Sequence, residues 1–252
     1  MKTLFLTWQD PSSRLWFPVG KLTHDGRLYH FVYLQGAINA HEQAGFQPII
    51  SFPDFSQEYG SLELFPLFQN RLRRRSRPDY SDFIQSLSLP LDQTDPIMIL
   101  ARSGGRRQTD TYEVLPCPDK NEFGQYQIHF FSHGLRHFPE SSQARVLTLQ
   151  TGDRLSILHD CQNTYDSRAL MLCTNDRHNV GFCPRYLNQD FFELVEKFPH
   201  KVQVTVDRIN PAPHPLQSRL LCHLTADWDT NFHPFSGPEY QSLVQQSADA
   251  IV

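Results

Sequence analysis

Apolar and polar residues alternate along the first 35 positions in the way that half-buried β-strands require. Alternating runs occupy residues 4–8, 16–22 and 27–34, with turn residues between them, and Asp25-Gly26 separates the last two runs. An Asp-Gly pair between alternating apolar runs is the strongest short-range signal of a β-hairpin. The pattern therefore predicts a β-meander in this part of the chain.

Helical spacing of apolar residues follows the meander. Residues 36–45 predict a short helix closed by glycine, and apolar residues from Leu64 to Leu72 keep a helical spacing until Pro78. A second helix is predicted to begin near Asp79. Residues 96–116 predict a strand, a Gly-Gly turn and another strand. These elements together predict an α+β domain, an antiparallel sheet with helices, over residues 1–118.

A polar, proline-bearing stretch at residues 116–122 is the candidate linker to a second domain. Beyond it, strands are predicted at residues 125–135, 144–160, 168–184 and 200–209. Residues 188–198 have a helical pattern, with Asn188 as a plausible N-cap. Short strands with one helix are typical of a small OB-like barrel. We therefore expect a mostly β domain at residues 124–229 and a polar tail at 230–252, frayed or folded as one short helix.

Composition supports two globular domains, because 252 residues exceed the usual length of one. Hydrophobic residues make up 39% of the chain and include 19 Phe, so a core can form without disulfides or metal. The formal net charge of −4 argues against a protein that coats nucleic acid or anionic membrane through bulk electrostatics. Any contact with DNA must therefore be local.

The cysteines and apolar runs indicate the compartment. The five cysteines contain no C-x-x-C pair, so we interpret them as small buried residues. The apolar stretch near Met1 is too short for a signal sequence. No apolar run approaches the ~20 residues that cross a bilayer. We expect a cytoplasmic protein that holds no metal and no cofactor.

One segment breaks the alternating pattern of the second half. Asn163, Tyr165, Asp166 and Arg168 lie within six positions, at the entrance to the apolar run 169–172. Asn and Asp are common turn residues, because their side chains bond their own backbone. The same groups, with a phenol and a guanidinium beside them, also suit recognition of a small polar ligand.

Three ordered motifs of the second half resemble the HIRAN domain. They are GLRHF at residues 134–138, NTYDSRAL at 163–170 and VGFCPRYL at 180–187. This module occurs in certain eukaryotic DNA-repair translocases and in stand-alone bacterial proteins. The resemblance implies an OB-like barrel that holds the free 3′ end of single-stranded DNA, stacking the terminal base and hydrogen-bonding the 3′ hydroxyl.

Carried over by position, the resemblance assigns DNA binding to six residues: Arg136, His137, Asn163, Tyr165, Asp166 and Arg185. An amide and a carboxylate can together grip a hydroxyl that internal nucleotides lack. The tyrosine offers a surface for base stacking, worth about 1–3 kcal/mol per base, and the histidine offers a second wall. The arginines suit phosphates, which a guanidinium binds in bidentate fashion.

Other interpretations of these residues stay open. The Asn-x-Tyr-Asp sequence can be turn chemistry alone. Arg136 and Arg185 can be solvated surface residues, and His137 can pack under Phe138 as a core histidine. The best-known eukaryotic member has an aromatic residue where this chain has His137, and proline where it has Thr164.

The first half resembles the small amino-terminal subdomain of HipA-type kinases. The motifs are VGKLTHDGRLYHFVYL at residues 19–34, PIISFP at 48–53 and FPLFQNRL at 65–72. The sequence contains no P-loop or kinase catalytic loop, and it is too short to add a kinase core. The resemblance therefore implies a protein-docking module, with a separately encoded HipA-type kinase or its antitoxin as the partner. The alternative is a domain that only braces the barrel.

Arginine-rich segments in the first half have two interpretations. Five arginines lie within residues 71–77, a density typical of nucleic-acid or targeting patches. The alternative is a solvated helix face with Leu72 on its buried side. Gly104-Gly105 with Arg106 and Arg107 can cradle an anion or form a hairpin turn.

These observations favour a non-enzymatic protein. The sequence has no Gly-x-Ser-x-Gly elbow, and its aspartates show no pairing that defines an acid and a base. We expect a second half that captures single-stranded DNA and a first half that docks a protein. The alternatives are a toxin–antitoxin component that partners a HipA-like kinase without binding DNA, and a metal-dependent nuclease using Asp160, Asp166 and Asp176.

Overall fold

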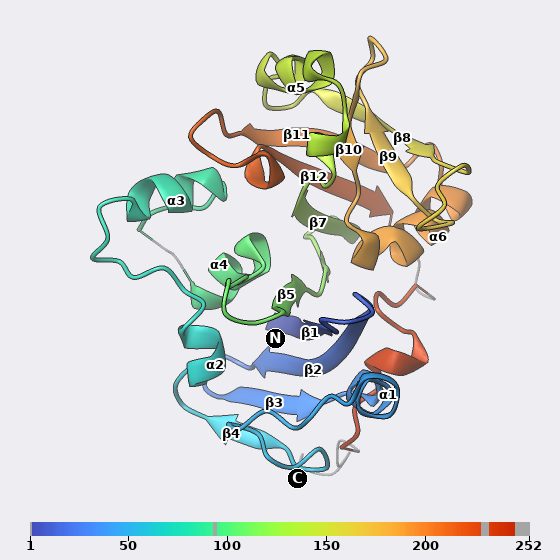
Figure 1. Ribbon diagram of the computed structural model, residues 1–252. Coiled ribbons are helices and arrows are strands. Elements are labelled where there is room, and N and C mark those ends of the chain that lie inside the picture. Colours follow the sequence, from blue (N-terminus) through green and yellow to red (C-terminus); the bar gives the residue numbers. More distant parts are fainter. Residues whose placement is uncertain (1, 93–94, 228–231, 245–252) are drawn as a thin grey trace. The chain divides into compact units, whose positions relative to one another are not determined.

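Two compact units make up the computed structural model, which describes residues 2–92, 95–227 and 232–244 (Figure 1). The first unit comprises the described residues within 1–80, 92–117 and 235–252, and the second those within 81–91 and 118–234. The passage at 117/118 lies at the predicted linker. Segment 81–91 belongs to the second unit, although the sequence pattern placed it in the first domain, and residues 235–244 of the predicted tail belong to the first unit.

The first unit contains a five-stranded antiparallel sheet in the order β4-β3-β2-β1-β5. Its strands are β1 (Lys2–Gln9), β2 (Trp16–His24), β3 (Tyr29–Tyr33), β4 (Tyr59–Ser61) and β5 (Tyr112–Pro116). The Asp25 carboxylate closes the β2–β3 hairpin by accepting hydrogen bonds from the amides of Arg27 and Leu28, both at 2.8 Å. The predicted meander and the α+β class of this unit are confirmed.

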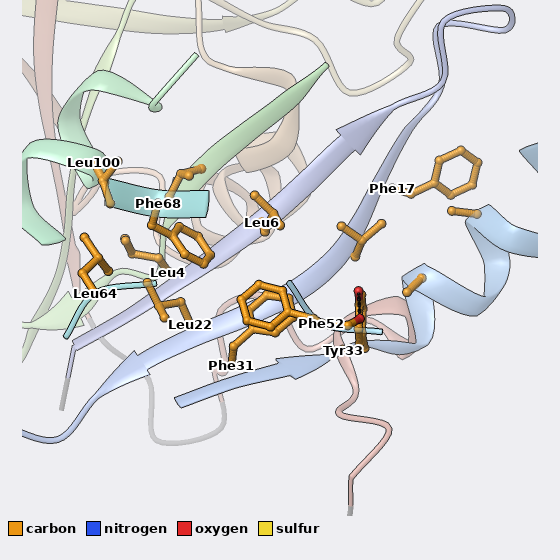
Figure 2. Packing of buried hydrophobic residues seen from close by; sticks show 14 of the residues in the cluster. Leu4, Leu6, Phe17, Leu22, Phe31, Tyr33, Phe52, Leu64, Phe68 and Leu100 are labelled. Carbon is orange, nitrogen blue, oxygen red and sulfur yellow. Dashed lines mark hydrogen bonds between the residues drawn. The ribbon is translucent and has the colours of Figure 1, made fainter. Parts of the chain in front are cut away.

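Aromatic and aliphatic side chains together form the core of the first unit (Figure 2). Phe31 stacks on Phe52 with ring centroids 4.0 Å apart. The Tyr33 hydroxyl lies in the same core and donates to the Phe52 carbonyl at 2.8 Å. Burial raises the pKa of the Tyr33 phenol above its ordinary value, which keeps this group a donor.

Helices of the first unit agree with the sequence pattern only in part. Helix α1 (Gln35–Ala44) ends at Gly45, as predicted, and α3 (Tyr80–Ser86) begins near Asp79 and continues into the second unit. The helix predicted around residues 64–72 is limited to α2 (Pro66–Gln69).

The prediction of a strand at residues 96–103 is wrong, because this segment is helix α4 (Pro96–Ser103). The Asp95 carboxylate caps it by accepting from the Ile97 amide at 2.9 Å, and Pro96 occupies the first turn. Gly104 ends the helix in the left-handed conformation, with φ of 71°. Local capping chemistry therefore outweighs the β-branched apolar run.

The second unit is built on a seven-stranded antiparallel sheet in the order β10-β9-β8-β11-β12-β7-β6. The strands are β6 (Asp119–Lys120), β7 (Gln125–Phe131), β8 (Arg154–His159), β9 (Leu170–Cys173), β10 (Asn179–Phe182), β11 (Gln203–Ile209) and β12 (Leu220–Asp227). The sequence pattern did not indicate β12.

The two ends of a six-strand stretch, β7 and β10, come back together. Just past β7, the backbones of His133 and Phe182 exchange hydrogen bonds of 2.9 and 2.8 Å. Ser132 Oγ donates to the Val180 carbonyl at 2.7 Å beside this bridge. The sheet therefore curls into a half-barrel whose two edges meet at this bridge, which is compatible with the predicted OB-like fold.

Closure of the barrel requires glycine at position 181. Gly181 has φ of 121°, and a Cβ atom there would lie 1.8 Å from Ser132 Oγ and 2.7 Å from the His133 carbonyl oxygen. No side chain fits at these distances. The absence of a side chain therefore permits the bridge between His133 and Phe182.

The second unit contains more helices than the single helix predicted for this domain. Helix α6 (Asn188–Lys197) was predicted, but residues 140–147, assigned in part to a strand, form α5 (Glu140–Leu147). Ser142 and Val146, four residues apart, are its buried positions, as one face of a helix requires. Asn188 is the first residue of α6 and not its N-cap, since Leu187 holds that position without a side-chain cap.

The described part of the predicted tail is packed and not frayed. Phe232 contacts Tyr126 in the second unit at 5.4 Å between ring centroids, and Phe235 contacts Phe5 in the first unit at 5.0 Å. The Leu243 amide donates to the Tyr33 carbonyl at 3.0 Å, alongside β3. Residues 230–231 and 245–252 of this prediction lie outside the described residues.

The burial of the cysteines agrees with the sequence pattern only in part. Cys173, Cys183 and Cys222 are buried as expected, whereas Cys117 is half-buried and Cys161 is exposed. No disulfide joins these five described cysteines. Among the described residues, no helix has the length and apolar character needed to cross a bilayer.

Candidate nucleic-acid interface

Asn163 shapes the loop that joins β8 to β9. Its side-chain carbonyl accepts hydrogen bonds from the backbone amides of Tyr165 at 3.0 Å and Asp166 at 3.1 Å. Its Nδ2 group donates to Asp160 Oδ2 at 3.2 Å. The turn chemistry considered for this sequence is therefore present, and it fixes the backbone on both sides of the Tyr165 side chain.

Tyr165 projects from this loop into solvent. The residue is 88% exposed, the second highest exposure among the large hydrophobic residues described as exposed. Its backbone is restrained by Asn163, so the ring is presented on an ordered loop and not on a frayed one. A planar, exposed and positioned ring is the geometry that stacking on a nucleobase requires.

Asp166 connects this loop to the start of α6 and to the 3₁₀ turn η2 (Arg185–Leu187). Its Oδ1 accepts from the Arg168 amide at 2.9 Å, and its Oδ2 accepts from Asn188 Nδ2 at 2.7 Å. Arg185 Nε lies 3.8 Å from the same Oδ2. Two predicted residues, Asp166 and Arg185, are thus brought together although they are 19 positions apart.

The Asp166 carboxylate retains hydrogen-bonding capacity. An ionised carboxylate has about four lone-pair positions, and two backbone or amide donors occupy part of them. Its side chain is 20% exposed, and the Arg185 side chain is 66% exposed. A ligand can therefore reach both an acceptor and a cation at this point of the barrel.

Arg136 and His137 lie in a second turn, η1 (Leu135–His137), which follows β7. Gly134 begins the turn with φ of 74°, and Phe138, directly after it, packs on Phe182 at 5.5 Å. Both Arg136 and His137 are exposed, with Arg136 Nε donating to His137 Nε2 at 3.1 Å. The core position considered for His137 is therefore wrong.

Strand β10 and its continuation link the two turns. His133, before η1, pairs with Phe182 at the end of β10. The next residue, Cys183, donates its amide to the Leu170 carbonyl at 2.8 Å and leads into Arg185. The three sequence motifs thus meet at one part of the barrel, with the η1 turn resting on Phe182 and the Asn163 loop contacting Arg185.

Two residues of this arrangement were not anticipated. Asn188 had a plausible role as a helix cap, but it instead holds Asp166. Asp160 was considered as a metal ligand, but it accepts the Asn163 amide. Within the described residues, no group of three or more His, Cys, Asp or Glu side chains has the arrangement of a metal site. Residue spacing alone cannot distinguish an Asn188 that caps the helix from one that donates to Asp166.

Comparison with known proteins identifies the second unit. Residues 125–229 match the family model of the HIRAN domain. Two crystal structures each align with 41% of this chain. A protein from Lactobacillus plantarum is 20% identical, with a TM-score of 0.32 and 97% of its chain covered. The HIRAN domain of human HLTF is 16% identical, with a TM-score of 0.30 and 75% covered.

The HIRAN match does not extend to the first unit. No curated protein matches the chain. The HIRAN match begins at residue 125, after the first unit's last strand. The resemblance of residues 4–116 to the HipA subdomain, and the protein-docking role that it implies, therefore stay predictions.

Proposed function

We propose, from the HIRAN domain at residues 125–229, that this protein binds single-stranded DNA and captures a free 3′ end without catalysing a reaction. The observation that carries the proposal is the 88% exposure of Tyr165 on a loop held by Asn163. An aromatic ring left in water gains free energy when a base covers it, by about 1–3 kcal/mol. The gain is independent of sequence, because every base has a planar face.

Discrimination for an end comes from the polar groups beside the ring. Asp166 has lone pairs left to accept a proton from a 3′ hydroxyl. The Asn163 amide group has two N–H donors, of which Asp160 takes one, and the other suits the hydroxyl oxygen. An internal phosphodiester at the same place would bring its negative charge against the Asp166 carboxylate and would be repelled.

Arginines supply the contacts to the adjacent phosphates. Arg185 is held near Asp166 at 3.8 Å with most of its side chain in solvent, and Arg136 is exposed on the η1 turn. His137 beside Arg136 offers a second wall for a base. These few cations fit a chain with a net charge of −4, because they act locally and need no basic surface around them.

Fluorescence anisotropy of a labelled single strand tests the role of the ring. We expect Tyr165→Ala to weaken binding by about 5- to 150-fold, the equivalent of 1–3 kcal/mol. Tyr165→Phe should bind nearly as well as the wild type, because stacking needs only the ring.

The matched control is Phe123→Ala, which removes another highly exposed ring, 78% in solvent, from the turn between β6 and β7. This variant should bind like the wild type. Failure of the wild-type protein to bind any single strand, or equal binding by Tyr165→Ala and wild type, would overturn the proposal.

A further inference from the structure

The arginine run at residues 71–77 is not the solvated helix face that its spacing suggested. Helix α2 ends at Gln69, and the side chain of Arg71 is only 1% exposed. Arg71 Nη1 donates to the Gly105 carbonyl at 2.9 Å, and Nη2 donates to Asp110 Oδ2 at 2.8 Å. Segment 71–79 is therefore fixed against segment 102–113 of the same unit.

Glycine permits the close approach of these two segments. A Cβ atom at Gly105 would lie 3.3 Å from Arg71 Cβ and 3.4 Å from Arg71 Cδ, tighter than an ordinary contact. Gly105 also has a positive φ of 56°. The turn considered as an anion cradle thus accepts a hydrogen bond from the buried Arg71 side chain. This contact joins two arginine-rich segments of the chain.

The joined segments carry a strong local positive charge. Residues 71–79 and 102–113 together contain eight arginines and three acidic residues, a net charge of +5 in a chain whose net charge is −4. Five of the arginines are exposed, and we refer to these as the arginine surface: Arg74, Arg75, Arg77, Arg106 and Arg107.

The acidic residues within these segments are already paired. Asp79 accepts from Arg73 and Arg77 at 2.8 Å, and Asp110 accepts from Arg71. Glu113, which is buried, accepts from Arg106 at 2.8 Å. In the part of the chain that the structure describes, no carboxylate forms an ion pair with Arg74 or Arg107, so their charges face solvent.

We propose that the arginine surface binds the phosphate backbone of nucleic acid. All eight cations are arginine, whose planar guanidinium matches a phosphate with two parallel hydrogen bonds and is less strongly hydrated than an ammonium group. A strand longer than the 3′-end pocket holds carries further phosphates, which are the polyanion that such a surface attracts. The inference extends the proposed DNA binding to the first unit but does not depend on the 3′-end pocket.

The test compares two double variants of the full chain. Arg74→Gln with Arg107→Gln removes two charges from the arginine surface. Arg14→Gln with Arg27→Gln removes two exposed charges from the β1–β2 and β2–β3 turns of the same unit. Arg106 is left intact, because its loss would strand the buried Glu113 carboxylate.

The measurement is the salt dependence of binding to a single strand of about 30 nucleotides, well beyond the ~4–16 that one OB fold covers. Each phosphate contact contributes about 0.7 to the slope of log K against log salt for a single strand. We expect the first double variant to make this negative slope shallower by about 1.4 and to bind more weakly at low salt. The second double variant should keep the wild-type slope. Equal slopes for the two double variants would overturn the inference.

Two further arms separate this surface from the 3′-end pocket and from a protein partner. A strand of about 5 nucleotides with a 3′ hydroxyl, within the ~4–16 that one OB fold covers, should depend on Tyr165 and not on Arg74 or Arg107. If Tyr165→Ala leaves that short strand unaffected while the long strand still depends on the arginines, the pocket fails and the surface stands. If polyglutamate competes as well as the long strand does, the surface recognises acidic chains in general and the nucleic-acid assignment is overturned.

Discussion

Two single residues, a glycine and an asparagine, determine whether the sheet of the second unit can close and whether its candidate site is exposed. Gly181 allows the backbone of β10 to pass Ser132 and His133, and Asn163 holds the loop from which Tyr165 projects. The role of Asn163 is local in the sequence, whereas the partners of Gly181 are almost 50 positions away. The glycine is visible in the sequence, whereas the contact that requires it is not.

Gly181→Ala is expected to destabilise the protein substantially. The left-handed backbone alone costs of the order of 1 kcal/mol for a non-glycine residue, and the clash with Ser132 Oγ and the His133 carbonyl adds to that. The cost of the clash is the difference in free energy of unfolding between Gly181→Ala and Gly152→Ala, measured with denaturant. Gly152 is the matched control because it has φ of 92° with nothing within 4 Å of its Cβ position. Equal free energies of unfolding for the two variants would show that the barrel does not close at this contact.

At the scale of elements, local patterns predicted those structures whose signals lie within a few residues. The β2–β3 hairpin follows from alternation around Asp25-Gly26, and α1 follows from its spacing and its terminal glycine. Helix α4 was not predicted although Asp95, Pro96 and Gly104 are all start and stop signals, because the short apolar run between them also fits a buried strand. The barrel closure and the pairing of Asn188 with Asp166 depend on distant residues and have no local signal.

Helix α5 is tied to the turn between β9 and β10 by one ion pair. Arg145 Nε donates to both oxygens of Asp176, at 3.2 and 2.9 Å. The hydrogen bonds from Arg145 and, second, from Thr174 lower the pKa of Asp176 to about 2, from an ordinary value of about 3.9. Because the pKa is lowered in the folded state, the pair contributes stability above pH ~3.9 and loses it as the pH falls through about 2.

Replacing Arg145 should therefore move the titration of Asp176. We expect Arg145→Ala to raise the pKa of Asp176 toward ~3.9, and Arg154→Ala, which removes an exposed arginine of β8, to leave it unchanged. The chemical shift of the Asp176 carboxyl carbon, followed by NMR from pH 6 to the acid limit, reports this pKa. A wild-type Asp176 that titrates with an ordinary pKa would contradict the pairing.

At the scale of the whole molecule, the second unit is completed by a piece of chain from the first half of the sequence. Segment 81–91 belongs to this unit, and its Ser86 carbonyl accepts from Asn210 Nδ2 at 2.9 Å. The same amide donates to the Ser218 carbonyl at 2.9 Å, and Asn210 is 2% exposed. Local composition can mark the linker between two domains, but it cannot show that an earlier segment of the chain packs in the later domain. The single predicted boundary therefore missed segment 81–91.

Asn210→Ala should therefore lower the stability of the full chain. The buried Ser86 carbonyl and the part-buried Ser218 carbonyl lose their donor, and the unsatisfied buried group costs about 1–3 kcal/mol. Thermal unfolding followed by circular dichroism measures the loss, with Asn175→Ala, an exposed residue of the β9–β10 turn, as the control. An unchanged transition temperature for Asn210→Ala would mean that segment 81–91 is not held at this point.

The central claim, capture of a 3′ end beside Tyr165 and Asp166, is tested most directly by changing only the terminus of the strand. Two labelled single strands of identical sequence, one ending in a 3′ hydroxyl and one in a 3′ phosphate, are titrated with the full chain and followed by fluorescence anisotropy. The account predicts that the hydroxyl strand binds at least about tenfold tighter, a difference of about 1.4 kcal/mol, and that Tyr165→Ala weakens its binding. Equal binding of the two strands would contradict recognition of the 3′ end.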